Sequence, residues 1–386
     1  MIRISIPYLL TITASILFII IAHNIAVNDM IGFQNPQGEY ARAKIQKIVD
    51  RFKPEFDFLD DYDDFEQDSF AMVQGETIVF EAKVTHGTRK GEVITAEQTF
   101  SPLLMDRSKE VESGDSVLLV NNEIGWYFGG YIRTTGLLVL GIVFILCLLL
   151  FGGKKGFNTI LSLGFTCTAI FAVFIPAILS GRNIYVMSLL VCAYTTSIVP
   201  LIVMGYNKKS LSAIAGCAAG IVISGIITLV MDKALHLTGI VDEHSRYLVN
   251  LPGEIQLNLN AVIFAGIIIG AMGAIMDVSI SISSALWEIR ENARRIQFKE
   301  LLRSGINIGR DIMGTMSDTL ILAYIGSSLT VVLLLSVYSG SALSLFNSEM
   351  IAVEILQALA GSLGILCAMP LTALFCSVIY LKEKKD

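Results

Sequence analysis

Charged residues are scarce in this 386-residue sequence, where Asp, Glu, Lys and Arg together make up only 16%. Hydrophobic residues make up 54%, and the mean hydropathy is +0.66. Soluble domains carry about 25% charged residues, so the shortage argues against that class and indicates a membrane protein with several spans. The net charge of −6 leaves no basic surplus, and we therefore expect no nucleic-acid partner.

Cysteine is missing from the polar region 24–133, because all six cysteines lie in apolar runs. A secreted disulfide framework is therefore not expected, and the cysteines are interpreted as small buried hydrophobic residues. The sequence also lacks H-E-x-x-H, G-x-S-x-G and glycine-rich phosphate-binding motifs. We therefore predict that the protein is not an enzyme and has no cofactor, and the sequence does not identify a metal.

Long apolar runs are what the sequence has in abundance. A spanning helix needs about 20 largely apolar residues, and eight charge-free runs approach or exceed that length. The runs are 4–22, 134–153, 156–181, 183–207, 210–231, 255–276, 319–348 and 355–381. We predict an all-α polytopic membrane protein of about eight transmembrane helices.

The distribution of Lys and Arg predicts the orientation of these helices. With the N-terminus inside, the cytoplasmic stretches carry 14 basic residues and the short external loops carry three. We therefore expect both termini in the cytoplasm and residues 24–133 outside. The first run could be a cleaved signal peptide, but a retained anchor is favoured because no A-x-A site follows it.

The region between the first two runs predicts a small β-rich extracytoplasmic domain. Alternating apolar and polar residues surround a glycine-containing turn at 87–91, and a second turn precedes the strand-like stretch SVLLV at 116–120. An acidic cluster at 55–68 is interpreted as a solvated linker. The predicted organisation is an anchor at 1–23, an acidic linker at 24–69, the β-rich domain at 70–131, a seven-helix transmembrane domain at 134–381 and a cytoplasmic tail at 382–386.

Asp277 is the only charged residue between Ile255 and Trp287, inside an apolar run. At helical spacing it belongs to one stripe of small and polar residues, composed of Gly266, Gly270, Gly273, Asp277, Ser281, Ser284 and Glu288. The glycines permit close approach of a neighbouring helix. A carboxylate at a helix centre costs on the order of 2.5–3.5 kcal/mol in a bilayer, so we expect Asp277 to face protein or water.

A second polar stripe precedes the seventh apolar run. Asn307, Asp311, Thr315 and Asp318 are spaced as one helical face, and Arg310 adjoins them. Asp277 and Asp318 could hold a cation, share a proton or pair with Arg310. Alternatively, Asp318 interacts with a helix dipole and the hydroxyls bond to their own helix. Pairing of Arg310 with Asp311 at the membrane surface is the favoured reading for those two residues.

Two long motifs resemble the YibE/F-like multi-spanning membrane proteins of bacteria: GAMGAIMDVSISISSALWEI at 270–289 and GRDIMGTMSDTLILAYIGSSL at 309–329. Shorter support comes from IPAILSGRN, LTGIVDEHSRYL and KVTHGTRKGEV, so the resemblance extends from about residue 75 to 381. It implies a location in the bacterial cytoplasmic membrane. It also implies that Asn is common where Asp318 stands, which weakens a mechanism that needs two carboxylates.

Two functions remain open from the sequence. The first is a secondary transporter or permease for an unidentified small solute or ion, with Asp277, Ser281, Ser284, Thr315 and Asp318 as candidate binding residues. The second is a non-transporting sensor, chaperone or assembly partner that acts through the extracytoplasmic domain. The expected partners are the lipid bilayer, the solute or ion, and further copies of the chain if it is an oligomer.

Overall fold

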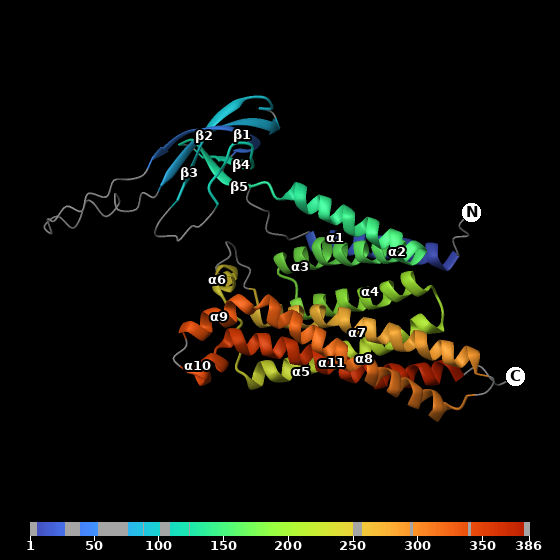
Figure 1. Cartoon of the computed structure of the whole chain (residues 1–386). Helices are drawn as coiled ribbons and strands as arrows, with labels where there is room; N and C mark the ends of the chain where they lie inside the picture. The colour runs from blue at the N-terminus through green and yellow to red at the C-terminus, as the bar shows by residue number, and fades with distance from the viewer. Residues whose placement is uncertain are drawn as a thin grey trace. The chain divides into compact units, whose positions relative to one another are not determined.

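The computed structural model forms two compact units, one of residues 1–31 and 147–386 and the other of residues 32–146 (Figure 1). The residues it describes are 6–27, 39–52, 76–87, 89–100, 109–122, 124–249, 257–293, 296–338 and 341–381. The acidic cluster expected at 55–68 and the cytoplasmic tail expected at 382–386 lie outside these residues.

The unit of residues 32–146 contains a closed five-stranded barrel. The strands are β1 (Glu39–Phe52), β2 (Thr77–His86), β3 (Val93–Thr99), β4 (Ser116–Asn121) and β5 (Trp126–Tyr131). They close in the order β1-β2-β3-β5-β4. Neighbouring strands pair antiparallel except β3 and β5, which pair parallel between Glu97 and Tyr127. The β-rich domain predicted between the first helix and the next is therefore confirmed.

The barrel has its own hydrophobic core, because apolar side chains alternate along its strands. On β2 the residues Ile78, Phe80, Ala82 and Val84 are buried, as period-two alternation requires. They pack with buried residues of the other strands, namely Ala41, Ala43, Ile45, Ile94, Ala96, Val111, Val117 and Leu119.

One boundary predicted from the sequence is corrected by β1. Residues 39–52 were expected in the acidic linker, but they form the longest strand of the barrel and pair with both β2 and β4. The stretch carries six charged residues, and their long polar side chains mask the alternation. Its buried residues are Ala41, Ala43 and Ile45, of which two are small, and Ile48 packs against the core while only partly buried.

The other unit is helical, and α2 continues into it from the barrel unit. Its helices are α1 (Ile6–Val27), α2 (Thr134–Ala169), η2 (Ile170–Phe174), α3 (Ile175–Leu179), α4 (Ile184–Met204), α5 (Lys208–Ala234), α6 (Glu243–Val249), α7 (Leu259–Asn292), α8 (Phe298–Ser327), α9 (Leu329–Tyr338), α10 (Ala342–Phe346) and α11 (Glu349–Leu381). Among the described residues, six helical stretches are long and apolar enough to cross a membrane. They number seven if α8 and α9, which bend by 59°, form one span.

Two of the eight apolar runs fall in a single helical stretch, which explains the difference in count. Residues Thr134–Leu179 form 46 residues of helix, and a straight helix of that length would be about 69 Å long. That is roughly twice the hydrocarbon thickness of a bilayer. The stretch is interrupted at Gly153, whose φ of 52° and ψ of −126° are not helical. The interruption lies at the junction of the runs 134–153 and 156–181.

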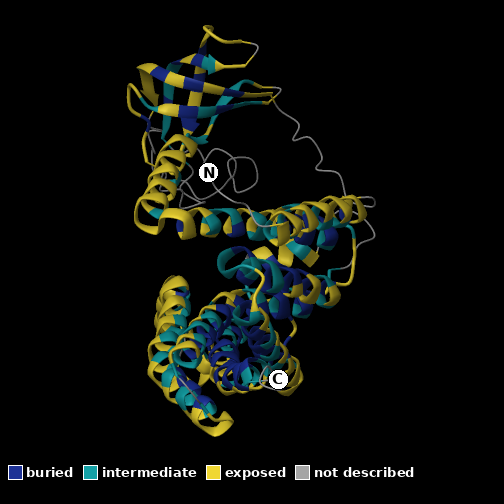
Figure 2. Ribbon diagram, turned by 90° about the vertical axis from the view of Figure 1, so that its right-hand side faces the viewer, coloured by how far each residue is buried: buried dark blue, intermediate teal, exposed yellow. Residues whose placement is uncertain are grey.

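The helical core is built on α7, which packs against α4, α5, α8 and α11 (Figure 1). Close approach depends on glycines of the neighbouring helices. A Cβ at Gly220 of α5 would lie 2.7 Å from the Ala368 Cβ of α11 and 2.8 Å from Ile275 Cγ2 of α7. A Cβ at Gly216 would overlap the side chain of Thr372. Buried residues accordingly concentrate where these helices meet (Figure 2).

Candidate functional site

The stripe of small and polar residues predicted around Asp277 lies on one continuous helix. Helix α7 runs from Leu259 to Asn292 without a break, and Asp277 lies near its middle. The helix begins where the side chain of Asn258 accepts a hydrogen bond from the Ala261 N–H at 3.1 Å. This cap satisfies a backbone donor that would otherwise be left without a partner.

Most of the stripe lies on a side of α7 that the described part of the chain leaves exposed. Its members Gly266, Gly270, Gly273, Asp277, Ser281 and Glu288 are exposed and Ser284 is half-buried. The remaining sides of the helix are packed, with Ile267, Ile268, Ile275, Val278 and Ile282 each fully buried. The most buried apolar residues of α7 therefore face the neighbouring helices, and Asp277 lies on the exposed side.

The three glycines of the stripe were expected to pack against a neighbouring helix, and only Gly270 is closely approached. A Cβ at Gly270 would lie 2.5 Å from the Tyr324 hydroxyl of α8. A Cβ at Gly266 or Gly273 would meet nothing within 4 Å. Close helix packing inside the unit instead uses glycines such as Gly216 and Gly220 on α5. Sequence spacing could not separate the two groups, because both follow helical periodicity.

Asp277 has no hydrogen bond or ion pair among the described residues. Its carboxylate acts electrostatically on the Cys217 thiol of α5. That thiol lies 3.8 Å from the Thr196 hydroxyl of α4. With no hydrogen-bond or ion-pair partner in the described part of the chain, the carboxylate keeps its oxygens available for water or a cation.

The second stripe lies on α8, and its residues are also exposed. These residues are Asn307, Arg310, Asp311, Thr315 and Asp318. The ion pairs seen in the described part of the chain all lie in the barrel, so Arg310 is not paired with Asp311 or Asp318. The Thr315 hydroxyl donates to the Ile312 carbonyl oxygen at 2.9 Å, which is a bond within its own helix.

The register between α7 and α8 places the two carboxylates at similar depths. The helices run antiparallel, and a Cβ at Gly305 or Gly309 would approach Leu286 or Ile282 respectively. Continuing this register places Asp277 opposite Gly314 and Asp318 opposite Gly273. The two carboxylates therefore differ by four residues, or about 6 Å along the helix axis.

No metal centre is formed around these carboxylates. In the ranges that the structure describes, no three His, Cys, Asp or Glu residues gather closely enough to hold a metal ion. A single carboxylate in an apolar helix can still exchange a proton or bind a cation transiently. The arrangement therefore places one carboxylate of each stripe, Asp277 on α7 and Asp318 on α8, at similar depths and beside small residues.

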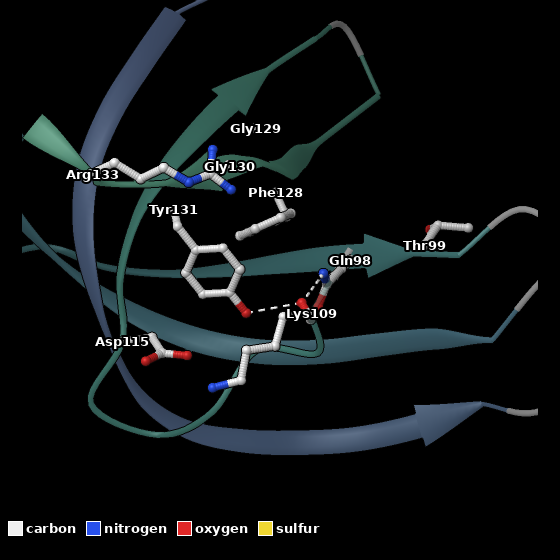
Figure 3. Close-up of a pocket in the computed structure, with 9 residues that line it drawn as sticks. All are labelled: Gln98, Thr99, Lys109, Asp115, Phe128, Gly129, Gly130, Tyr131 and Arg133. Carbon is white, nitrogen blue, oxygen red and sulfur yellow. Dashed lines mark hydrogen bonds between the residues drawn. The ribbon is translucent and has the colours of Figure 1, made fainter. Parts of the chain in front are cut away.

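The barrel contains a cavity that the sequence did not point to. It has a volume of about 550 Å³ (Figure 3). It is lined by Gln98, Thr99, Lys109, Asp115, Phe128, Gly129, Gly130, Tyr131 and Arg133. The only signals in the sequence are the adjacent glycines of β5 and the aromatic and basic residues just before the second apolar run, and neither indicates a cavity by itself.

Hydrogen bonds hold the wall of this cavity in place. The Tyr131 hydroxyl donates to the carbonyl oxygens of Lys109 at 2.9 Å and Glu110 at 2.8 Å. The Gln98 amide donates to the same Lys109 carbonyl at 3.0 Å and accepts from the Val111 N–H at 2.9 Å (Figure 3). Burial raises the pKa of Tyr131, and the nearby carboxylates of Asp115 and Glu112 raise it further. The ordinary pKa of a phenol already lies well above neutral pH, so the Tyr131 hydroxyl is protonated there and can donate both bonds.

Several apolar helices long enough to span a bilayer, joined to one small barrel, define a multi-pass membrane protein. The family described as YibE/F-like protein matches residues 140–382, which is more than half of the chain. The chain belongs to this family. The match begins at residue 140, so the barrel lies outside it, whereas the resemblance in sequence was expected from about residue 75. No curated protein and no solved structure gives a significant match.

Proposed function

We propose that the protein is a secondary transporter or permease in which the Asp277 carboxylate binds the transported or coupling cation. One observation carries the proposal: an aspartate with no partner among the described residues lies near the middle of the most buried helix of the bundle. Leaving such a group in hydrocarbon costs on the order of 2.5–3.5 kcal/mol. We infer that a charge placed at such a free-energy cost has a function.

The neighbours of Asp277 support movement along this side of α7. Gly273 and Gly314 have no atom within 4 Å of an added Cβ, so both helix surfaces are smooth beside the carboxylate. Ser281, Thr315 and Asp318 add oxygens on the exposed sides of α7 and α8, and the half-buried Ser284 adds another. In this proposal they exchange with the hydration shell of a cation as it passes Asp277. Protonation or cation binding would then shift the packing between inward-open and outward-open states.

The experiment is transport by the purified full-length protein in proteoliposomes. Proton flux is followed with a trapped pH-sensitive dye, and uptake of alkali and divalent metal cations is followed by elemental analysis. We expect Asp277→Asn to lower the rate at least tenfold, because the amide keeps the shape but loses the charge. Asp277→Glu should retain part of the rate.

Asp311→Asn is the matched control, since Asp311 is also an exposed helix carboxylate but lies two turns nearer the start of α8 than Asp318. It should transport at nearly the wild-type rate. Equal flux through Asp277→Asn and the wild type, with both proteins folded, would remove Asp277 from the mechanism.

The proposed orientation places both termini in the cytoplasm of a bacterial cell and the barrel outside. Its support is the excess of basic residues in the stretches assigned to the cytoplasm. A cysteine introduced at Lys154 in a chain without its native cysteines should then react with an impermeant maleimide only after the membrane is opened. Labelling of intact cells at that position would reverse the assignment.

A sensor, chaperone or assembly partner is the second candidate function, and the closed barrel favours it. The barrel has its own buried core and its own cavity, which are features of a binding module. In this alternative the barrel recognises a partner, and the helices anchor the protein in the membrane or transmit the binding signal across it. The two candidates make opposite predictions for a chain that lacks the barrel.

A further inference from the structure

The cavity of the barrel lies beside the start of α2, whose apolar residues are numerous enough to cross a membrane. Strand β5 ends at Tyr131, Arg133 lines the cavity, and α2 begins at the next residue, Thr134. Residues 134–146 belong to the same compact unit as the barrel, and all but one of them are exposed. Tyrosine and basic residues beside such an apolar run lie at the level of the lipid headgroups.

The cavity carries charges of both signs. Lys109 and Arg133 supply positive charge, Asp115 supplies negative charge, and the ring of Phe128 supplies an apolar wall (Figure 3). The Lys109 ammonium lies 3.5 Å from a Glu112 carboxylate oxygen, but both side chains are about 70% exposed, so this pair is weak. Lys109 can therefore turn towards a ligand at little cost.

A bulge in β5 forms the part of the cavity wall that Gly129 and Gly130 line. Leu118 pairs with Gly130 and Leu119 pairs with Phe128, so Gly129 is the extra residue of the bulge. A Cβ at Gly129 would lie 2.5 Å from Val120 Cγ2 and 3.2 Å from the Leu118 carbonyl oxygen. Gly130 has a φ of +141°, which other residues rarely adopt. Both cavity-lining positions therefore require residues without side chains.

We propose that this cavity binds the zwitterionic headgroup of a membrane phospholipid, of the phosphoethanolamine type. The phosphate contacts Lys109 and Arg133, and the ammonium contacts Asp115. A volume of about 550 Å³ suits a headgroup, since ligand sites range over about 300–1,000 Å³. A purely anionic headgroup fits less well, because Asp115 and the neighbouring Glu112 would repel it.

The proposal is tested by titrating the full-length protein in detergent with short-chain phosphatidylethanolamine and phosphatidylglycerol. Bound lipid is counted by native mass spectrometry. We expect the wild type to prefer phosphatidylethanolamine. Lys109→Gln and Arg133→Gln should each weaken the binding of both lipids about two- to fivefold, which is the effect expected from losing one exposed charge pair. Asp115→Asn should weaken the binding of phosphatidylethanolamine. The binding of phosphatidylglycerol should be unchanged or tighter.

Lys47→Gln is the matched control, because Lys47 is an exposed lysine of the same barrel that does not line the cavity. It should bind both lipids as the wild type does. Lys109→Arg, which keeps the charge, should also retain binding and so separates charge loss from misfolding. Unchanged lipid binding in all three cavity variants would overturn the proposal. Equally tight binding of soluble glycerophosphoethanolamine would also overturn it in favour of a soluble phosphate ligand.

Discussion

Glycine serves two distinct purposes at the surfaces of the membrane helices. On α5, Gly220 lies where a Cβ would press on Ala368, Ile275 and the Gly364 carbonyl oxygen, so its lack of a side chain lets three helices meet. Gly273 on α7 borders open space instead. Both look alike in the sequence, because each repeats with neighbours at helical spacing. Their different roles become visible only when the facing helices are present.

Gly220→Ala is predicted to destabilise the protein by about 1–3 kcal/mol, because the added methyl group must displace backbone of α11. Gly225→Ala on the same helix is the control, since its Cβ would lie 3.5 Å from the Phe264 ring, an ordinary contact. That variant should be neutral or gain up to about 1 kcal/mol from helix propensity. Thermal unfolding of both variants in detergent measures the difference, and equal melting temperatures would contradict the packing.

At the scale of elements, α2 shows how one residue can divide a helix. The apolar pattern runs almost without interruption from Thr134 to Leu179, and only Lys154 and Lys155 mark a boundary. Gly153 leaves the helical conformation beside these lysines, with a φ of 52°. The position of the break could be predicted from the charges, whereas its conformation could not.

Gly153→Ala should therefore cost about 1–3 kcal/mol of stability, since residues with a Cβ rarely adopt this backbone conformation. Gly152→Ala is the neighbouring control, because Gly152 has no positive φ and a Cβ there meets nothing within 4 Å. Chemical denaturation of the two variants should show a loss only for the first. If Gly153→Ala were as stable as the wild type, a continuous helix through residue 153 would be the better description.

The strands of the barrel were predictable to different degrees. The hairpin of β2 and β3 follows from strict alternation around a glycine turn, and β4 follows from its apolar residues after a turn. Strand β1 escaped prediction because charged residues fill its outer side and alanines fill much of its inner side. Its place in the sheet depends on pairing with β2 and β4, which are far from it in sequence.

At the scale of the whole molecule, the division into a barrel unit and a helical unit makes the two candidate functions separable. A chain without residues 36–130 should keep its helices, because the barrel core is built only from barrel residues. If the protein is a transporter, the shortened chain should still transport in proteoliposomes, at a changed rate. If it is a sensor or assembly partner, the deletion should abolish its activity in cells while the helices still insert. Loss of transport on deletion, with the helices folded, would count against an autonomous transport function in the helical unit.

The sequence by itself determined the membrane class, the apolar helices, the β-rich segment and the stripe of polar residues on α7, because these depend on composition and on local periodicity. Only the tertiary structure decided which side of each helix is covered. It showed that Asp277 lies on the uncovered side, that Gly220 rather than Gly273 brings helices together, and that β5 forms a cavity wall. The physical reason is that burial and cavities arise from contacts between segments distant in the chain, and periodicity along one segment does not record its partners.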